Sequence, residues 1–514
     1  MCLLWRPWLR AWLAAIGLAC LAAPAAAQDE ALRVGSKRFT ESYILAELLA
    51  QAAAPQLPAR PVVRQGLGNT AIVYEALRSG AIDLYAEYTG TISQEILKSP
   101  QPLSMPALNE ALRPLGLGVA IPLGFNDGYA FAMRADAAQR LGIRTLSDLT
   151  KHPALKLGLT NEFIGRADGW RGVQSRYALP QAPTGLDHGI AYDAIAAGQV
   201  DVIDIYTTDA KIEHLGLTVL EDDKGYFPRY DAVVLYRLDV PQRFAPAWAA
   251  LRKLEGRIDE HAMIGMNARA ELQGVGFEAI ARDFLAAQRG AAAAPSPAAG
   301  TGGFAARLFG PDLGRLARQH LLLVAVSTGL AVLLGVPMAV AVFPRPRLRA
   351  VVLAATGLLQ TVPSLALLAI LISLLGVIGA VPALVALTLY ALLPIMRNTV
   401  AGLAEVSHGL RQAGTALGMT RVQNLRLVQL PLALPTMVAG IRTAATIGVG
   451  TATIAAFIGA GGFGERIVTG LALNDKQLLV AGALPAAALA LASELLFEAL
   501  EWWLRRGRGA QASV

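Results

Sequence analysis

The sequence divides into a part that is rich in charges and a part that is built from long apolar runs. Up to about residue 290 charged side chains are frequent, whereas from Leu321 onward the apolar runs approach the ~20 residues that a helix needs to cross a bilayer core. The whole chain is 54% hydrophobic and 16% charged, too apolar for an average soluble protein and too charged for a purely membrane-embedded one. We therefore predict an extramembrane domain followed by a membrane domain. The five predicted helices of the membrane domain lie at roughly 321–343, 350–374, 379–396, 434–460 and 477–500.

Residues 1–27 have the three-part layout of a secretory signal peptide. Arg6 and Arg10 supply a positive start, an apolar stretch runs from Ala11 to Ala23, and three alanines at 25–27 form a small-residue cleavage pattern. The alternative is an uncleaved anchor helix. The signal predicts that the following domain lies on the periplasmic or extracellular side.

The formal net charge of +7 is partly gathered in clusters beside the apolar runs, at 345–349 and 505–508. Arginines in such places mark the cytoplasmic ends of membrane helices. Five helices with an outside N-terminus and an inside C-terminus satisfy this pattern. A nucleic-acid binder would instead carry a basic patch or stripe. We predict a multi-pass protein of the inner (cytoplasmic) membrane with no nucleic-acid partner.

Short strands alternate with amphipathic helices across residues 28–290. Such alternation predicts an α/β fold with mainly parallel sheets, and a segment of this length fits two lobes better than one. The stretch from Thr40 to Gln51 is predicted to be a helix with Thr40 as its N-cap. The strand candidates are Leu32–Val34, Ala81–Tyr85, Lys156–Leu159, Val200–Ile205 and Ala232–Tyr236.

Residues 291–303 consist almost wholly of Ala, Pro and Gly and have no core-forming pattern, so they are predicted to be a flexible linker. The membrane domain is then assigned to 304–508. Within it, a long polar segment at 405–431 joins the third and fourth helices on the predicted cytoplasmic side.

That cytoplasmic segment resembles the "EAA" loop of bacterial ABC import permeases. The family pattern reads Glu-Ala-Ala, three residues, Gly, nine residues and Ile-x-Leu-Pro. Gln412 and Gly414 depart from it, standing for Glu and the second Ala. The resemblance implies a short helix, turned at the Gly, that docks on an ABC ATP-binding subunit; the alternative is an ordinary basic loop. The matching positions are Gln412, Ala413, Gly414, Gly418, Leu430 and Pro431.

Three further stretches of the membrane domain resemble the permeases of glycine betaine, carnitine and choline uptake systems. They are Gln360–Ala366 (QTVPSLA), Tyr390–Thr399 (YALLPIMRNT) and Ile458–Gly464 (IGAGGFG). Because permeases of this family work as pairs, the resemblance implies a homodimer in the lipid bilayer.

No pattern for catalysis, a metal or a cofactor is found. The glycines at 459, 461 and 464 match a dinucleotide fingerprint by letters, but that fingerprint requires a βαβ unit rather than a membrane helix before it. A phosphate-binding Gly-x4-Gly-Lys-Ser/Thr loop is missing, so ATP hydrolysis is assigned to a separate subunit. Cys2 and Cys20 both lie in the signal segment, and the six histidines are scattered. We expect no enzyme activity, no cofactor and no metal.

Tyrosines stand at positions where a ligand cleft is expected. Tyr88 and Tyr206 fall at the carboxyl ends of predicted strands, where open α/β sheets bind ligands. Tyr129 and Tyr230 lie in loops of similar composition. A quaternary ammonium ion donates no hydrogen bond and is held by aromatic faces, so converging tyrosines would suit it. Taken singly, each Tyr is more often a core or surface residue.

The motifs around these tyrosines resemble the binding proteins of the same betaine and choline uptake family. What this implies is a type II-like, two-lobed periplasmic-binding-protein fold ahead of an all-α polytopic ABC permease domain with about five helices. Tyr88, Tyr129, Tyr206 and Tyr230 would form an aromatic box, with the main chain of Asp127 contributing. The motifs are Gly35–Glu41, Glu87–Thr91, Asn126–Ala130, Glu162–Gly169 and Leu220–Lys224.

The resemblance also implies which residues hold a ligand carboxylate, namely Lys37, Thr91 and Arg166. Arg166 has an alternative as a surface partner of Asp168. Ser42 stands where many members have Gln, which leaves the ligand open.

The function predicted from all this is ATP-driven import of a quaternary ammonium osmolyte such as glycine betaine, choline or carnitine. An alternative within the family is an importer of ergothioneine or another zwitterion. Alternatives from other classes are a membrane-tethered ligand sensor and a membrane-anchored exported enzyme.

Overall fold

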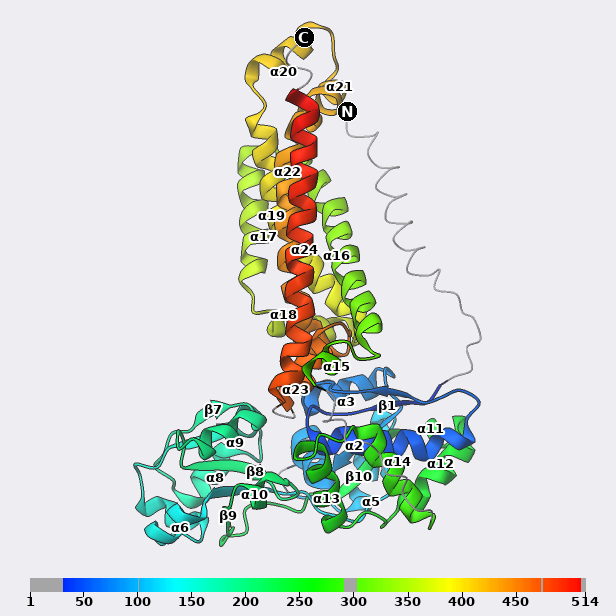
Figure 1. The fold of residues 1–514 in the computed structure, drawn as a ribbon, viewed down its shortest axis with the longest axis vertical. Helices are drawn as coiled ribbons and strands as arrows, with labels where there is room; N and C mark the ends of the chain where they lie inside the picture. Colours follow the sequence, from blue (N-terminus) through cyan, green and yellow to red (C-terminus); the bar gives the residue numbers. More distant parts are fainter. Residues whose placement is uncertain (1–30, 100, 291–302, 473–474, 510–514) are drawn as a thin grey trace.

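The computed structural model describes residues 31–99, 101–290, 303–472 and 475–509. A two-lobed α/β part lies at one end of an elongated helical bundle (Figure 1). This arrangement confirms the predicted fold class. The predicted signal peptide and all but the last residue of the predicted linker lie outside the described residues.

The first lobe contains a five-stranded sheet in the order β2-β1-β3-β10-β4. Its strands are β1 (Arg33–Gly35), β2 (Val62–Arg64), β3 (Leu84–Tyr88), β4 (Leu117–Ala120) and β10 (Ala232–Arg237). Its helices are α2 (Thr40–Ala53), α3 (Thr70–Arg78), α4 (Thr89–Thr91), α5 (Met105–Leu112), α11 (Val240–Arg243), α12 (Ala245–Leu251), α13 (Glu260–Glu271) and α14 (Phe277–Gln288).

The second lobe repeats this plan with the order β7-β6-β8-β5-β9. Its strands are β5 (Tyr129–Arg134), β6 (Leu157–Thr160), β7 (Thr184–Leu186), β8 (Val202–Tyr206) and β9 (Leu217–Leu220). Its helices are α6 (Ala135–Leu141), α7 (Asn161–Gly165), α8 (Trp170–Tyr177), α9 (His188–Ala196) and α10 (Lys211–His214).

The sheets are mixed rather than mainly parallel, so that part of the prediction is wrong. In each sheet two neighbouring pairs are parallel and two are antiparallel. The antiparallel strand is the one that enters from the other lobe: β10 in the first sheet and β5 in the second. The chain crosses between lobes twice, and the crossing segments pair at Asn126 and Asp231. These crossings form the joint about which the lobes meet.

The N-cap of α2 is Phe39, in extended conformation and without a side-chain cap, so the prediction of Thr40 as N-cap is wrong. The first turn of α2 is buried against the second lobe and α13. Ser42 in this turn accepts a hydrogen bond from the Lys37 amide at 2.8 Å and so stabilises the loop before the helix. Tertiary contacts therefore replace the local cap expected from sequence.

Among the described residues, four helices of the bundle are long and apolar enough to cross a membrane: Leu313–Val342, Ala380–Glu405, Arg421–Ile458 and Lys476–Trp503. The bent pair Pro346–Thr361 and Ser364–Leu375 makes five if it counts as one span. The bundle elements are α15 (Phe304–Leu308), α16 (Leu313–Val342), α17 (Pro346–Thr361), α18 (Ser364–Leu375), α19 (Ala380–Glu405), α20 (His408–Ala416), α21 (Arg421–Asn424), α22 (Leu430–Ala452), η8 (Thr453–Ile458), α23 (Gly464–Ala472) and α24 (Lys476–Gly509).

The second predicted span is not one helix, because α17 and α18 meet at a bend of 100°. Pro363 has no N–H to continue a helix and forces its predecessor Val362 into an extended conformation. The hydroxyl of Tyr390 donates to the carbonyl of Val362 at 2.7 Å, which satisfies one group freed by the break.

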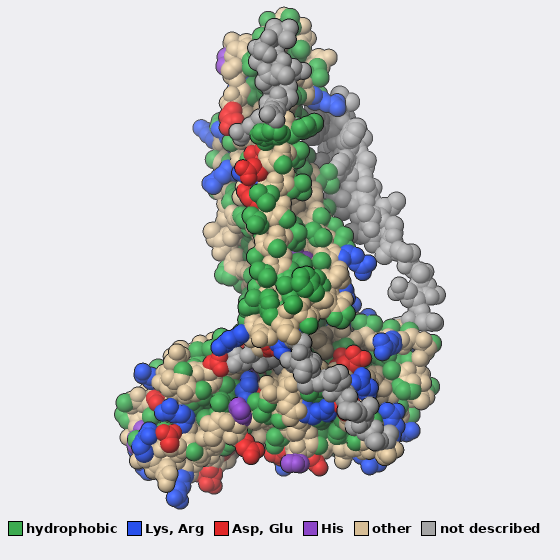
Figure 2. Space-filling model, in the orientation of Figure 1, with side chains coloured by type: hydrophobic (Ala, Val, Ile, Leu, Met, Phe, Trp, Pro, Cys, Tyr) green, Lys and Arg blue, Asp and Glu red, His purple; other side chains and the backbone are tan. Residues whose placement is uncertain are grey.

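The surfaces of the two parts differ as the composition predicts. Figure 2 shows many hydrophobic side chains along the visible bundle and few charged ones over its middle part, while Lys, Arg, Asp and Glu are spread over the lobes. Exposed leucines such as Leu322, Leu374 and Leu496 lie on bundle helices. An apolar outer surface of this kind suits a lipid environment.

Candidate functional site

A small cavity lies between the lobes at the ends of three strands. Tyr88 ends β3, Tyr129 begins β5 and Tyr206 ends β8; in the antiparallel pairing of β5 with β8, Tyr129 lies opposite Tyr206. Tyr230 lies on the crossing segment just before β10. All four predicted tyrosines are thus brought together. The cavity is lined by Lys37, Phe39, Tyr88, Thr91, Asp127, Tyr129, Glu162, Arg166, Tyr206 and Tyr230.

The tyrosine rings are close enough to surround a small cation. The ring centroids of Tyr129 and Tyr206 are 5.1 Å apart, and Tyr230 stands edge-on to Tyr129 at 5.8 Å. Phe39 adds a fifth ring, 5.2 Å from Tyr206. Sequence reasoning missed Phe39, although it lies inside the motif Gly35–Glu41 that was singled out.

Two of the ring faces are covered by the protein's own cations. The Nζ atom of Lys37 lies 4.7 Å from the centroid of Tyr88, and the guanidinium carbon of Arg166 lies 5.1 Å from that of Tyr129. The cavity between them measures only ≈ 10 Å³, about the room of one water molecule. The lobes are therefore closed tightly, and a ligand enters only when they part.

Each of these cations also has a carboxylate partner. Lys37 pairs with Glu87 at 2.6 Å, and both side chains are buried. Arg166 makes a two-pronged contact with Asp168, at 2.7 and 2.6 Å. The Arg166 guanidinium also donates to Thr91 Oγ1 at 3.2 Å, which joins the second lobe to the first. Arg166 is buried, so the alternative of a surface pair with Asp168 is replaced by a buried pair at the cavity wall.

Asp127 and Ser42 lie differently from the other predicted site residues. The amide of Asp127 already donates to the carbonyl of Tyr230 at 3.0 Å, and its side-chain carboxyl group accepts from the backbone amide of Thr208 at 3.3 Å. Ser42 is buried against the Lys37 amide and does not line the cavity. Its influence on a ligand would pass through the position of Lys37.

An acidic network lies directly behind the box. The Tyr88 hydroxyl donates to Glu41 at 2.5 Å, and Thr208 donates to the other oxygen of the same carboxyl group at 2.6 Å. Asn267 of α13 approaches that oxygen at 3.3 Å. Burial raises the pKa of Glu41 to about 7 and raises that of Asp127 well above its usual range. Sequence reasoning missed this network because its members come from distant segments.

Glu162 is a further lining residue that sequence reasoning did not select. It lies in the first turn of α7 (Asn161–Gly165), and its carboxylate is 3.9 Å from Arg166. It also lines an adjoining cavity of ≈ 110 Å³ that shares Lys37, Phe39 and Tyr206 with the box. The box therefore continues into a second compartment, whose far wall includes His188.

The predicted cytoplasmic loop folds as a short helix followed by a turn. Ser407 caps α20 by accepting the Leu410 amide, and Gly418 leaves the helix with a φ of +81°. A positive φ favours glycine, so this turn accounts for the Gly of the motif. Gln412, Ala413 and Gly414 lie on α20, while Leu430 and Pro431 begin α22.

Gly414 packs against the segment that follows the turn. A Cβ atom placed on Gly414 would lie 2.5 Å from the side-chain nitrogen Nδ2 of Asn424, which is too close for a real contact. Asn424 in turn donates to the carbonyl of Arg411 at 2.8 Å. The departure from the family's Ala is thus matched by an Asn side chain that occupies the space of the missing methyl group.

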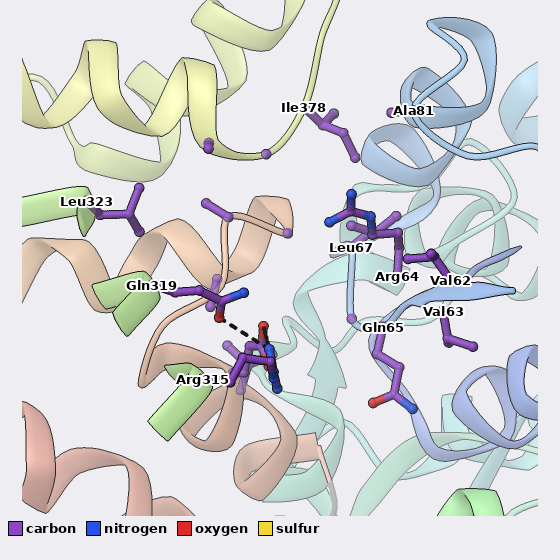
Figure 3. Close-up of a pocket in the computed structure, with 18 of the residues that line it drawn as sticks. Val62, Val63, Arg64, Gln65, Leu67, Ala81, Arg315, Gln319, Leu323 and Ile378 are labelled. Atoms are coloured by element: carbon purple, nitrogen blue, oxygen red, sulfur yellow. Dashed lines mark hydrogen bonds and ion pairs between the residues drawn. The ribbon is translucent and has the colours of Figure 1, made fainter. Parts of the chain in front are cut away.

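The first lobe sits on the bundle around a larger cavity of ≈ 970 Å³ (Figure 3). Arg64 and Gln65, from β2 and the loop after it, face Arg315 and Gln319 of α16 across this space. The dashed contact in the figure joins Arg315 to Gln319 at 3.2 Å.

Within the described residues, no group of three or more His, Cys, Asp or Glu side chains is arranged to hold a metal ion.

Comparison with known families assigns both parts of the chain. Residues 30–287 match the substrate binding domain of the ABC-type glycine betaine transport system. Residues 331–506 match the binding-protein-dependent transport system inner membrane component.

Individual relatives cover one part or the other. The ergothioneine transport permease/ergothioneine binding protein EgtU of Helicobacter pylori is 31% identical over 51% of this chain, and the match spans 48% of that protein, about half its length. The osmoprotectant import permease protein OsmW of Salmonella typhimurium is 44% identical over 38% of this chain and 89% of its own. A glycine-betaine-binding protein of Pseudomonas aeruginosa is 32% identical over 52% of this chain and 92% of its own.

Proposed function

The chain belongs to the family of ABC-type glycine betaine transport systems, with a substrate-binding domain fused ahead of the inner-membrane component, and from this premise we propose that it imports a zwitterionic quaternary amine. The observation that carries the proposal is the cavity in which aromatic rings and two buried cations face the same small space.

The rings would hold the quaternary ammonium group. Each desolvated contact between such a cation and an aromatic face contributes about 2 kcal/mol. Among the contacts of the described residues, no Lys or Arg side chain lies over the rings of Tyr206 and Tyr230. Lys37 approaches Phe39 at 5.5 Å, somewhat farther than its 4.7 Å from Tyr88.

A ligand carboxylate would meet Arg166, Lys37 and Thr91. Both cations are already paired with carboxylates, Lys37 with Glu87 and Arg166 with Asp168, so the preference rests on hydrogen bonding: a ligand carboxylate can accept from their N–H groups, and choline has no carboxylate to do so. The lining thus favours glycine betaine, carnitine or a similar zwitterion over choline.

Ergothioneine is the second candidate, and the adjoining cavity favours it. A ligand that carries a ring beside its trimethylammonium and carboxylate groups needs more room than glycine betaine. The ≈ 110 Å³ compartment lined by Asn161, His188 and Tyr206 adjoins the box and offers polar groups to such a ring.

The transport cycle would follow from the two-lobed architecture. Ligand closes the lobes, the closed domain engages the outer end of the bundle, and ATP hydrolysis by a separate subunit bound at α20 reorients the permease. The proposal includes a homodimer in the inner membrane, with the binding lobes on the outer side.

Calorimetry on the full chain in nanodiscs tests the ligand assignment. The titrants are glycine betaine, carnitine, proline betaine, ergothioneine and choline. We expect a zwitterion to bind at least tenfold more tightly than choline. Binding of none of these compounds would sink the quaternary-amine proposal, and equal affinity for choline would remove the carboxylate role of Arg166 and Lys37.

A further inference from the structure

Arg38 stands where three parts of the molecule meet. It belongs to the first-lobe loop between β1 and α2, and its neighbours Lys37 and Phe39 both line the ligand cavity. Its side chain reaches out of the cavity to Asp187 of the second lobe and to Phe457 of the bundle. The adjoining compartment is lined by Arg38, Asp187 and Gly68 as well, so this junction lies at the mouth of the cleft.

The two partners of Arg38 report on different parts of the molecule: Asp187 on closure of the lobes, and Phe457 on the bundle. Arg38 Nη2 is 3.4 Å from Asp187 Oδ2, and this ion pair exists only while the lobes are closed, because the two residues lie on opposite lobes. The guanidinium carbon is 4.8 Å from the centroid of Phe457, the range of a cation–π contact. The Arg38 amide donates to the carbonyl of Gly68 at 3.0 Å, which holds the backbone of the loop in place.

The backbone around Phe457 is held close to the first lobe as well. A Cβ on Gly68, whose φ is +81°, would lie 3.4 Å from the carbonyl oxygen of Phe457. Two residues further on, Gly459 approaches Leu67 so closely that a Cβ there would lie 2.6 Å from its side chain. The end of η8 therefore lies in direct contact with residues 67–68 of the first lobe.

Phe457 is joined to the core of the bundle through its neighbours. Ile458 and Ala455 of the same turn are buried in a cluster with Tyr390 of α19 and Leu371 of α18. A change in the position of Phe457 therefore reaches α18, the second half of the bent span, and α19, the helix after it, because close-packed side chains move together.

We propose that Arg38 is a coupling residue that reports closure of the lobes to the permease. In the closed domain Asp187 holds the planar guanidinium in the position where it lies over Phe457. In the open domain Asp187 moves away, and Arg38 loses the partner that fixes its side chain. Binding of a ligand beside Lys37 and Phe39 thereby leads to a contact between Arg38 and Phe457 of η8. The inference deepens the proposed import function and rests on it.

The second lobe also contacts the bundle through a second, weaker ion pair. Lys476 Nζ lies 4.0 Å from Asp193 of α9, and its side chain is 86% exposed. An exposed pair at this distance contributes little. This pair supplies a matched control, because it also links a lobe to the bundle but does not touch the cleft.

The main test measures ligand binding and uptake separately. Phe457→Ala, Arg38→Ala, Arg38→Lys and Lys476→Ala are introduced into the chromosomal copy, so that the organism's own ATP-binding subunit is present. Uptake of the tightest-binding compound among glycine betaine, carnitine and ergothioneine is measured in cells, and its Kd on the full chain in nanodiscs.

We expect Phe457→Ala to leave Kd within twofold and to lower uptake at least tenfold. Phe457→Tyr keeps a ring face and should restore uptake, while Lys476→Ala should change neither quantity. Because Arg38 and Phe457 act through one contact, the double variant should be no worse than Phe457→Ala. Normal uptake in Phe457→Ala, or losses that multiply in the double variant, would overturn the proposal.

A second measurement needs no ligand and separates this inference from the import function. Spin labels at Glu213→Cys in α10 and Lys476→Cys report the distance between the second lobe and the bundle; Cys2 and Cys20 are replaced by Ser. The closed lobes that the unsubstituted protein samples without ligand should give a narrow peak in the distance distribution, which Arg38→Ala and Phe457→Ala broaden. If no quaternary amine binds but the distribution broadens, the coupling contact stands and the ligand assignment fails. An unchanged distribution in both variants contradicts the coupling role.

Discussion

The hydroxyl of Thr208 in the second lobe donates to the carboxyl group of Glu41 in the first lobe across 2.6 Å. The same carboxyl group accepts from Tyr88, one wall of the aromatic box, so ring position and lobe closure share one acidic side chain. Asp127 and Asp209 face this network, and burial raises the pKa of Glu41 to about 7. We therefore expect the protonation of Glu41 to change when the lobes close.

Ligand affinity is expected to depend on pH through this group. The closed form holds Glu41 buried with a pKa of about 7, whereas opening lets its pKa fall toward the ordinary 4.5. The closed form then binds a proton that the open form releases, so acid favours closure. We expect affinity for glycine betaine, whose own charge is constant in this range, to fall about tenfold between about pH 5 and pH 7 and then to level.

Calorimetric titrations at several pH values check this expectation, with Glu41→Gln as the comparison. Gln keeps the shape of the side chain and carries no charge, so its profile should be flatter. An equally steep profile in Glu41→Gln would assign the pH dependence to Asp127 or another group.

Tyr206→Ala should weaken ligand binding tenfold or more. Loss of one desolvated cation–π contact costs about 2 kcal/mol, and about 1.4 kcal/mol corresponds to a factor of ten. Tyr206→Phe keeps the ring and loses only a hydroxyl that lies 3.5 Å from that of Tyr129, so its Kd should stay within about twofold. Equal affinities for all three proteins would exclude Tyr206 from the box.

Arg166→Lys should reduce discrimination between zwitterions and choline. Lysine keeps the charge but loses the planar fork that contacts Asp168 and Thr91, and a point charge orients a carboxylate less well. We expect affinity for glycine betaine to drop about tenfold while that for choline changes little. A parallel loss for both ligands in competition binding would indicate a purely structural role.

Gly414→Ala should impair transport without affecting ligand binding. The added methyl group would collide with the Asn424 side chain and displace the turn after α20, the helix that we propose docks on the ATP-binding subunit. Gly409→Ala is the matched control, since it lies on the same helix and no atom lies within 4 Å of its added Cβ. Uptake at wild-type rate in Gly414→Ala would show that docking tolerates the displaced turn.

Arg442→Ala should destabilise the bundle. Arg442 of α22 lies 3.3 Å from Glu494 and 3.5 Å from Glu501 of α24, within apolar helices where an uncompensated carboxylate is unfavourable. The pair is partly exposed, so we expect a loss of about 1 kcal/mol, or ~2–4 °C in the unfolding temperature. Arg442→Lys should lose less in a thermal-shift assay; an equal loss would show that packing, not charge, is responsible.

Much of the architecture was predictable because it depends on local composition. Apolar runs of membrane length mark bundle helices whatever they pack against, and the alternation of short strands and helices indicates α/β lobes. The bend between α17 and α18 was missed because averaged hydropathy runs across Val362 and Pro363 without a break. The mixed sheets were missed because strand direction in β5 and β10 depends on the chain crossing between lobes.

The candidate site was only partly predictable for a similar reason. Sequence motifs selected the four tyrosines, Lys37, Thr91 and Arg166, and the structure places all of them around one cavity. Phe39 and Glu162 lie in the same motifs but were passed over, because the motif alone does not say which way each side chain points.

By itself the sequence determined what kinds of groups are available: membrane-length apolar helices, a two-lobed α/β domain, aromatic side chains and a polar loop that contains Gly418. Only the tertiary structure decided which groups face each other. Lys37 lies over Tyr88, Thr208 donates to Glu41, and Arg38 contacts both Asp187 and Phe457. The physical reason is that ion pairs, cation–π contacts and pKa shifts depend on distance and burial. For residues on different lobes or domains, closure of the lobes and their seating on the bundle set both quantities.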